Sequence, residues 1–175
     1  MLLDWMRDLR AGVSYDINVR PTVIPEPDHY WDRVRPWLRA VGVRHGIVKA
    51  SDEDINFLSQ ALSGGDPIDV AAGWVEQFGL GLAVITLGPG GGVAIEPGGA
   101  VTRAAGFPTT VVDTVGAGDT FMAGFLDGHV RMGLDLESSL RRGAAAASIV
   151  CSRRGAQPPT SAEVDDLVAT YDEPD

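Results

Sequence analysis

The chain has 175 residues, of which 45% are hydrophobic and 22% are charged, a composition typical of a globular domain with its own core. Its 14 basic and 24 acidic residues give a net charge of −10, which argues against a nucleic-acid-binding protein, where a basic surface is expected. The single cysteine, Cys151, excludes an intrachain disulfide and a cysteine-based zinc site. We find neither a signal-peptide core nor an 18-residue apolar run, so we expect a cytoplasmic protein without a membrane partner.

Apolar strands and amphipathic helices alternate along the chain. The expected helices cover residues 2–9, 28–41, 52–62, 67–78, 120–132, 136–150 and 161–171. The expected strands cover residues 13–17, 46–49, 82–87 and 93–96, and a turn and a further strand fall within 98–105. Pro36 should kink the second helix or divide it into two shorter helices, and residues 172–175 should fray. This alternation predicts an α/β protein that forms a single domain, 1–175, with a mostly parallel, covered sheet.

A glycine turn at residues 116–118 lies between the apolar run 109–112 and the helix 120–132. Its glycines let the backbone turn sharply and approach a ligand, and a helix that starts there offers free N–H groups and the positive end of its dipole. We therefore expect a strand, a turn and a helix that together bind an anion such as phosphate. Asp119 is then either a capping acid or a carboxylate that accepts a proton from an attacking hydroxyl.

Two other phosphate-binding motifs fit this stretch poorly. The dinucleotide fingerprint requires a third small residue where this chain has Phe121, and no βαβ unit with a ribose-binding acid follows. The Walker-type loop requires Gly-Lys-Ser/Thr, which is absent from the sequence. An NAD-binding domain is accordingly disfavoured.

The string Asp-Thr-Val-Gly-Ala-Gly-Asp-Thr-Phe at residues 113–121 resembles a more specific pattern. It is similar to the C-terminal signature of the ribokinase-like (PfkB) family of carbohydrate and nucleoside kinases, Asp-Thr-x-Gly-Ala-Gly-Asp-x-Phe. The resemblance implies that Gly116, Ala117 and Gly118 form the anion hole for the transferred phosphoryl group. It also implies that Asp119 is the base that deprotonates the sugar hydroxyl.

Two segments nearer the N-terminus also resemble this family. Residues 15–21, Tyr-Asp-Ile-Asn-Val-Arg-Pro, resemble the Phe-Asp-Pro-Asn-x-Arg strand end of sugar kinases, fructokinases especially, although they also read as a polar turn closed by proline. Ser51 and Asp54 have the spacing of a helix capping box. They also resemble the family motif Lys-x-Asn/Ser-x-x-Glu, which would place Ser51 near the nucleotide phosphates and give Asp54 a role in holding Mg²⁺, through water where its shorter side chain requires it.

The glycine-rich segment after the strand 82–87 has two interpretations. It is either a simple hairpin tip or the family segment Thr-x-Gly-x-x-Gly, whose backbone lines the ATP phosphates and ribose. The second interpretation assigns cofactor binding to Thr86, Gly88 and Gly91. Gly143 opens a run of small residues that either flanks the adenine pocket, as in the family, or permits close helix packing.

A loop near the C-terminus completes the resemblance. Residues 153–157, Arg-Arg-Gly-Ala-Gln, are similar to the family's Lys/Arg-Gly-Ala loop. In the family, backbone carbonyls of this loop and the first acid of Asp-Thr hold a monovalent cation. The resemblance therefore implies that Asp113 and Gly155 bind a cation such as K⁺.

These motifs follow the family's order and imply a ribokinase-like three-layer α/β/α fold and ATP-dependent phosphorylation of a sugar hydroxyl, most like fructokinase, with Mg²⁺. The resemblance covers only the family's C-terminal half, so the Gly-Gly signature, most sugar contacts and the lid are missing. The alternative is a non-catalytic nucleotide-binding remnant or one piece of a split kinase. The expected partners are a sugar and ATP, with a second copy of the chain or a complementing N-terminal half.

Overall fold

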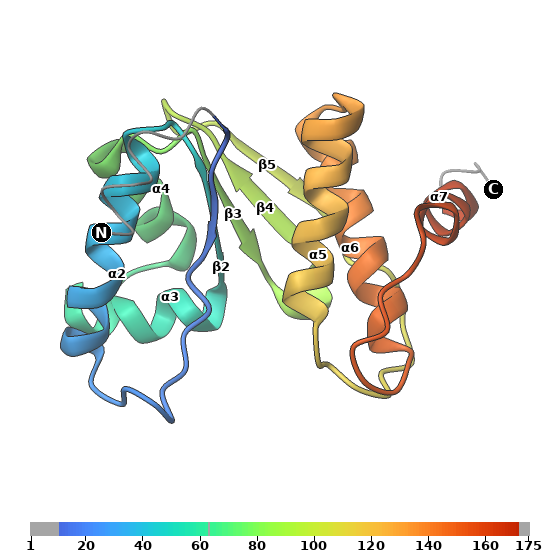
Figure 1. Ribbon diagram of the computed structural model, residues 1–175, viewed down its shortest axis with the longest axis horizontal. Coiled ribbons are helices and arrows are strands. Elements are labelled where there is room, and N and C mark those ends of the chain that lie inside the picture. The colour runs from blue at the N-terminus through green and yellow to red at the C-terminus, as the bar shows by residue number, and fades with distance from the viewer. Residues whose placement is uncertain (1–10, 63, 172–175) are drawn as a thin grey trace. The chain divides into compact units, whose positions relative to one another are not determined.

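The computed structural model describes residues 11–62 and 64–171 (Figure 1). The predicted helix 2–9 and the tail 172–175 lie outside these residues. Five strands form one sheet in the order in which they occur along the chain: β1 (Ser14–Asp16), β2 (Ile47–Ser51), β3 (Leu82–Thr86), β4 (Gly92–Ile95) and β5 (Val101–Ala104). The helices are α2 (Pro27–Gly42), α3 (Asp52–Ser59), α4 (Pro67–Phe78), α5 (Ala117–Leu126), α6 (Leu136–Cys151) and α7 (Ser161–Thr170).

The chain folds into two compact units. The first unit contains the chain up to Thr86 together with Ala94–Val101. The second contains Leu87–Val93 and the chain from Thr102 onward. The single domain expected from the sequence stays a prediction.

The first unit is built on three parallel strands. In their register Asp16 pairs with Lys49, and Ser51 pairs with Thr86. The interior residues of β2 and β3 are almost wholly buried, as the continuous apolar runs predict for a sheet covered by helices. Trp31 of α2 stacks on Trp74 of α4 with a centroid separation of 5.6 Å, so these aromatic residues belong to the core.

Helix α2 continues through Pro36, so of the two predicted outcomes the division into two helices is wrong, and the kink stays a prediction. An interior proline removes one backbone hydrogen bond and costs about 3 kcal/mol. The buried face of α2 continues on both sides of the proline, through Trp31 and Val34 before it and Leu38 and Val41 after it. Because tertiary packing supplies most helix stability in proteins, this continuous face outweighs the local loss.

In the second unit, the backbones of α5 and α6 pack unusually close together. A Cβ atom added at Gly124 of α5 would lie 2.8 Å from the Arg142 carbonyl oxygen, and one added at Gly143 of α6 would lie 2.8 Å from the Phe121 carbonyl oxygen. Only glycine at both positions allows the two backbones to approach this closely. Helix α7 then packs on α6 through Val164.

A buried guanidinium group joins three segments of the second unit. Arg142 of α6 lies 2.9 Å from the Asp127 carboxylate, which follows α5, and it also pairs with Asp165 of α7. Hydrogen bonds from Arg131 and then from Arg142 hold the pKa of Asp127 below its ordinary value. The charge is therefore neutralised where the helices meet, as burial of an arginine requires.

Two sequence predictions fail beside the glycine turn. The apolar run 109–112 is not a strand: Val111 and Val112 are each 60% exposed, and the Val112 N–H donates to the Cys151 carbonyl at the end of α6 instead of to a neighbouring strand. The helix expected over 120–132 begins earlier, at Ala117, and changes to π-helical geometry over Asp127–Met132. The glycine turn is thus partly the first turn of α5.

Two glycine substitutions test the packing of the first unit. A Cβ atom at Gly42 would lie 1.8 Å from the Phe78 carbonyl oxygen, so Gly42→Ala should lower the free energy of unfolding by about 1–3 kcal/mol. Gly73 lies inside α4, and its added Cβ would meet nothing within 4 Å, so Gly73→Ala should raise that free energy by about 0.4–1 kcal/mol. Urea denaturation measures both, and a neutral Gly42→Ala variant would contradict the close approach.

Candidate phosphate-binding and catalytic residues

The start of α5 has the geometry of an anion site. Gly116 is the N-cap, with a left-handed φ of 81°, and a Cβ atom there would lie 3.0 Å from the Ala156 side chain, so both conformation and space favour glycine. Ala117, Gly118 and Asp119 form the first helical turn, whose N–H groups have no acceptor within the helix. The Ala117 N–H donates to the Thr114 carbonyl at 3.2 Å, which leaves the amides of Gly118 and Asp119. These amides and the helix dipole favour a bound anion such as phosphate.

Asp119 does not cap α5, because the N-cap position belongs to Gly116. Its side chain is exposed, and no other group in the described part of the chain forms a hydrogen bond or an ion pair with its carboxylate. Asp119 is therefore a solvent-accessible carboxylate beside the first-turn amides. This placement suits a group that accepts a proton next to a bound phosphate.

Asp113 contacts the loop that contains Gly155. One Asp113 carboxylate oxygen accepts the Val115 N–H at 3.0 Å, and the other accepts the Gly155 N–H at 2.9 Å. These bonds, Val115 first, lower the pKa of Asp113 below its ordinary value of 3.8. The structure thus brings together the two residues that the sequence assigned to a monovalent cation, although Gly155 contributes its N–H to this contact and its carbonyl accepts the Gln157 N–H.

The glycine-rich segment after β3 forms a tight turn within the second unit. The Leu87 N–H donates to the Gly91 carbonyl at 2.9 Å, and the Gly91 N–H donates to the Gly88 carbonyl at 3.1 Å. Gly91 has a φ of 89°, and a Cβ atom there would lie 2.2 Å from the Ala104 carbonyl oxygen. The backbone therefore requires glycine at residue 91.

Gly143 lies in the contact between α5 and α6, where its missing side chain makes room for Phe121. Close packing of α6 on α5 accounts for this glycine without a ligand. Its predicted part in an adenine pocket stays a prediction.

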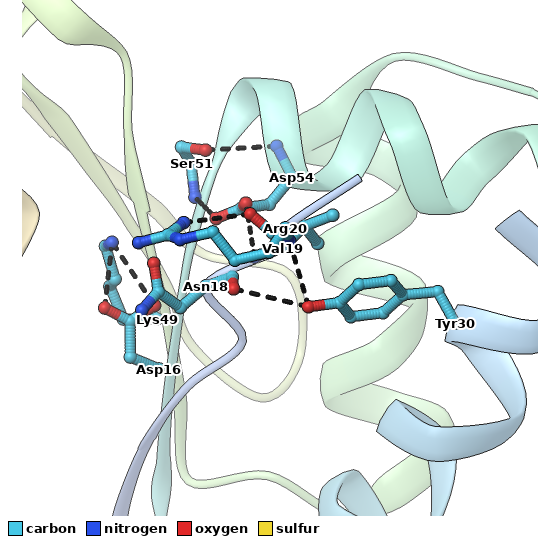
Figure 2. A network of polar contacts seen from close by, with 8 residues as sticks. All are labelled: Asp16, Asn18, Val19, Arg20, Tyr30, Lys49, Ser51 and Asp54. Atoms are coloured by element: carbon cyan, nitrogen blue, oxygen red, sulfur yellow. Dashed lines mark hydrogen bonds and ion pairs between the residues drawn. The ribbon is translucent and has the colours of Figure 1, made fainter. Parts of the chain in front are cut away.

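Ser51 and Asp54 form the capping box that their spacing predicts. The Ser51 hydroxyl accepts the Asp54 N–H at 3.0 Å, and the Asp54 carboxylate accepts the Ser51 N–H at 2.9 Å (Figure 2). The second Asp54 oxygen accepts the Val19 N–H at 2.9 Å, a contact that the sequence did not predict. Asp54 is only 8% exposed, so its carboxylate is largely committed to backbone groups.

Sequence reasoning gave no role to two further polar residues of this region, Lys49 of the Lys-x-Asn/Ser-x-x-Glu motif and Tyr30. The Lys49 ammonium is buried, and it donates to both oxygens of Asp16, at 3.0 and 3.3 Å (Figure 2). The Tyr30 hydroxyl accepts the Arg20 N–H at 3.0 Å and lies 3.4 Å from the Asn18 carbonyl oxygen. A charged residue inside the apolar strand 46–49 was a usable signal for Lys49, whereas nothing along the chain links Tyr30 to residues 18–20.

The candidate residues fall into two groups. Ser51, Asp54 and Thr86 lie in the first unit, where Ser51 and Thr86 are register partners at the carboxyl ends of parallel strands. The remaining candidates lie in the second unit: Gly88, Gly91, Asp113, Gly116, Ala117, Gly118, Asp119, Gly143 and Gly155. Parallel α/β sheets bind ligands at the carboxyl ends of their strands, and helix N-termini bind phosphate. Each unit of this α/β protein thus presents, by itself, a feature at which α/β proteins bind ligands.

Comparison with known proteins identifies the family. The model of the pfkB family carbohydrate kinases matches residues 16–163, and the chain belongs to this family. It is 39% identical over 166 residues to a 5-dehydro-2-deoxygluconokinase of Bacillus subtilis (strain 168), a match that covers 91% of the chain and 47% of that protein. It is 38% identical over 114 residues to a fructokinase of Rhizobium leguminosarum bv. trifolii, a match that covers 65% of the chain and 32% of that protein.

A solved structure supports the same fold. The fructokinase from Xylella fastidiosa, solved with bound ATP, superimposes with a TM-score of 0.83 at 25% identity, over 98% of this chain and 57% of that one. The predicted ribokinase-like α/β fold is confirmed. Although the matches to the Bacillus subtilis and Xylella fastidiosa proteins cover nearly all of this chain, the chain spans only about half the length of each of these two relatives. Among residues 11–62 and 64–171, no helix is both long enough and apolar enough to cross a membrane.

Acidification tests the contact between Asp113 and Gly155. Since the folded-state pKa of Asp113 is lowered, its bonds stabilise the fold above the ordinary aspartate pKa, and this contribution is lost as the pH falls through the lower folded-state value. We therefore expect Asp113→Asn to be less stable than the unaltered chain at pH 7, with a difference that shrinks below about pH 4. Urea denaturation of both proteins at pH 7 and below about pH 4 measures their free energies of unfolding. A stability difference that grows on acidification would contradict the role of the ionised Asp113 carboxylate in this contact.

Proposed function

We propose that this chain binds ATP and forms the phosphate side of a fructokinase-like sugar kinase. The observation that carries the proposal is the start of α5, where Gly116 caps the helix and the exposed Asp119 carboxylate stands in the first turn. The Ala117 N–H donates to the Thr114 carbonyl, so the amides of Gly118 and Asp119 are the first-turn donors that could meet a phosphate. Phosphoryl transfer depends mainly on positioning and on electrostatic stabilisation of the phosphoryl oxygens. A glycine-capped helix start with an adjacent carboxylate meets both needs.

In the proposed reaction, Asp119 accepts the proton of the sugar hydroxyl as the hydroxyl oxygen attacks the terminal phosphorus of ATP. The bond between that phosphorus and the oxygen that bridges it to the β-phosphate breaks, and ADP leaves. The anion hole of residues 116–118 would stabilise the charge that develops on the phosphoryl oxygens through the N–H groups of Gly116 and Gly118, since the Ala117 N–H donates to the Thr114 carbonyl. The turn formed by Gly88 and Gly91 and the end of β3 at Thr86 would line the nucleotide, as the family resemblance implies. Because a helix start fixes the direction of its amides, these donors would stay aimed at the phosphate.

Two cations belong to this proposal. Bound Mg²⁺ would neutralise charge on the ATP phosphates. The buried Asp54 carboxylate already accepts two backbone N–H groups, so it fits Mg²⁺ poorly as a direct ligand, and any contact would run through retained water. For K⁺, the Asp113 carboxylate and the loop at Gly155 lie together. Both Asp113 oxygens accept backbone N–H groups and the Gly155 carbonyl accepts the Gln157 N–H, so an ion bound here would share these oxygens with their present donors.

The sugar and the remainder of the active site are also part of the proposal. Since the chain matches only about half of its longer relatives, we propose that the other half of such a kinase supplies most sugar contacts and that this chain alone phosphorylates little sugar. A cytoplasmic kinase completed by a second copy or by an N-terminal half fits this arrangement. The competing function, a nucleotide-binding remnant without catalysis, would bind ATP but would never phosphorylate a sugar in any such complex.

Nucleotide preference tests the first part of the proposal. Calorimetry with the 175-residue chain should show binding of ATP with Mg²⁺ and weaker or no binding of NAD. The physical reason is that the first turn of α5 offers an anion site, whereas the dinucleotide fingerprint is incomplete at Phe121. Binding of NAD without ATP would overturn both the kinase and the remnant interpretations.

The base is tested by Asp119→Asn. The chain would be combined with the N-terminal half of a fructokinase, and turnover of fructose should fall by about 100-fold or more while ATP binding persists. Glu137→Gln is the matched control, because Glu137 is also an acid in the first turn of a helix of the second unit. Near-normal turnover in Asp119→Asn would remove this residue from the mechanism.

A further inference from the structure

The segment that follows β1 is held in an unusual backbone conformation. Ile17 and Val19 are buried, at 4% and 6% exposure, whereas Asn18 and Arg20 between and after them are exposed. Asn18 has a φ of 50°, in the left-handed region, which asparagine adopts more readily than other residues with a side chain. Such a conformation persists only where the surroundings determine it, and it often marks a functional segment.

Three hydrogen bonds to three different elements hold this segment, and Figure 2 shows those of Val19 and Arg20. The backbone N–H groups of the segment are the donors, and the acceptors come from β2, α3 and α2. The pairs are Ile17 N–H to the Lys49 carbonyl at 3.0 Å, Val19 N–H to the Asp54 carboxylate at 2.9 Å, and Arg20 N–H to the Tyr30 hydroxyl at 3.0 Å. The middle contact is the only one of the three that uses a charged acceptor, and charge-assisted bonds are about twice as strong as neutral ones.

Asp54 therefore joins two strand ends with one carboxylate. One oxygen accepts the Ser51 N–H, where β2 passes into α3, and the other accepts the Val19 N–H, just beyond β1. Its charge also lies in the first turn of α3, where the helix dipole favours an acid. The two strand ends are neighbours at the carboxyl edge of the parallel strands, where ligands of α/β proteins bind.

We propose that Asp54 is a positioning residue, which fixes the segment 18–20 and thereby sets where the Asn18 and Arg20 side chains stand at the ligand edge of the sheet. This goes beyond the function proposed above, in which Asp54 acts through water on Mg²⁺. The effect of Asp54 on nucleotide affinity rests on that proposed function. The effect of Asp54 on the backbone of residues 18–20 does not.

The test uses the 175-residue chain with the substitution Asp54→Ala. Nuclear magnetic resonance would follow hydrogen exchange at the Val19 amide, and calorimetry would measure ATP affinity at several Mg²⁺ concentrations. Removal of the acceptor should make exchange at Val19 about tenfold faster or more, and ATP affinity should fall by a similar factor at every Mg²⁺ concentration. The matched control is Asp52→Ala, because Asp52 lies in the same helical turn but accepts only the N–H of its neighbour Glu53.

Two results would overturn the proposal. One is unchanged protection of the Val19 amide in Asp54→Ala. The other is an affinity loss that added Mg²⁺ restores, which would make Asp54 a magnesium-side acid. If no form of the chain binds ATP, the proposed function fails, but exchange at Val19 still decides whether Asp54 positions the segment.

Tyr30→Phe provides an independent variant if Asp54→Ala does not fold. It removes only the hydroxyl that accepts the Arg20 N–H, so exchange at Arg20 should become faster while the Ser51 amide keeps its protection. ATP affinity of the Tyr30→Phe chain should fall as well, because the segment 18–20 is then less firmly held. A loosened segment with unchanged ATP affinity would show that the position of residues 18–20 does not matter to the ligand, and would overturn the proposal.

Discussion

The parallel pairing of β1, β2 and β3 is the constraint on which the first unit depends. Parallel strands all end at the same edge, so residues that are far apart along the chain meet there: Asp16 beside Lys49, and Ser51 beside Thr86. The strands are buried, so the backbone N–H groups beyond their ends need acceptors other than water. The Asp54 carboxylate meets this need twice, and the polar edge of the unit is built around it.

Acidic residues satisfy backbone N–H groups throughout the molecule. Asp113 accepts from Val115 and Gly155 in the second unit, as Asp54 accepts from Val19 and Ser51 in the first. Glu163 serves the start of α7 in the same manner, within a capping box with Thr160. This use of carboxylates explains part of the net charge of −10 without reference to a ligand.

Asp119 stands apart from these acids. It lies in the first turn of α5, yet Gly116 supplies the cap, and the described residues leave its carboxylate exposed and without a partner. A glycine cap has no side chain to accept the Gly118 or Asp119 N–H, whereas a serine or aspartate cap would occupy one of them. The glycine cap therefore leaves these two amides, and the acid beside them, without a side-chain partner among the described residues.

Local chemistry made several elements predictable from the sequence. The helix 67–78 was predicted to the residue, because Pro67 favours the first helical position and Gly79 adopts the left-handed conformation that ends a helix. The capping box of Ser51 and Asp54 follows from their spacing alone. Local rules did not decide between a kink and a division at Pro36, where a buried face keeps one helix. They failed at residues 109–112, whose backbone bonds to the end of α6 instead of forming a strand.

The sequence by itself determined the family and the glycine-turn motif, because both depend on short contiguous strings such as residues 113–121. It also determined which residues could form caps, since a cap involves neighbours within three or four positions. Only the tertiary structure decided that one Asp54 oxygen holds Val19, 35 positions away, and that Tyr30 holds Arg20. Such contacts depend on how separate elements pack, and no local periodicity or propensity encodes the distance between two groups brought together by folding.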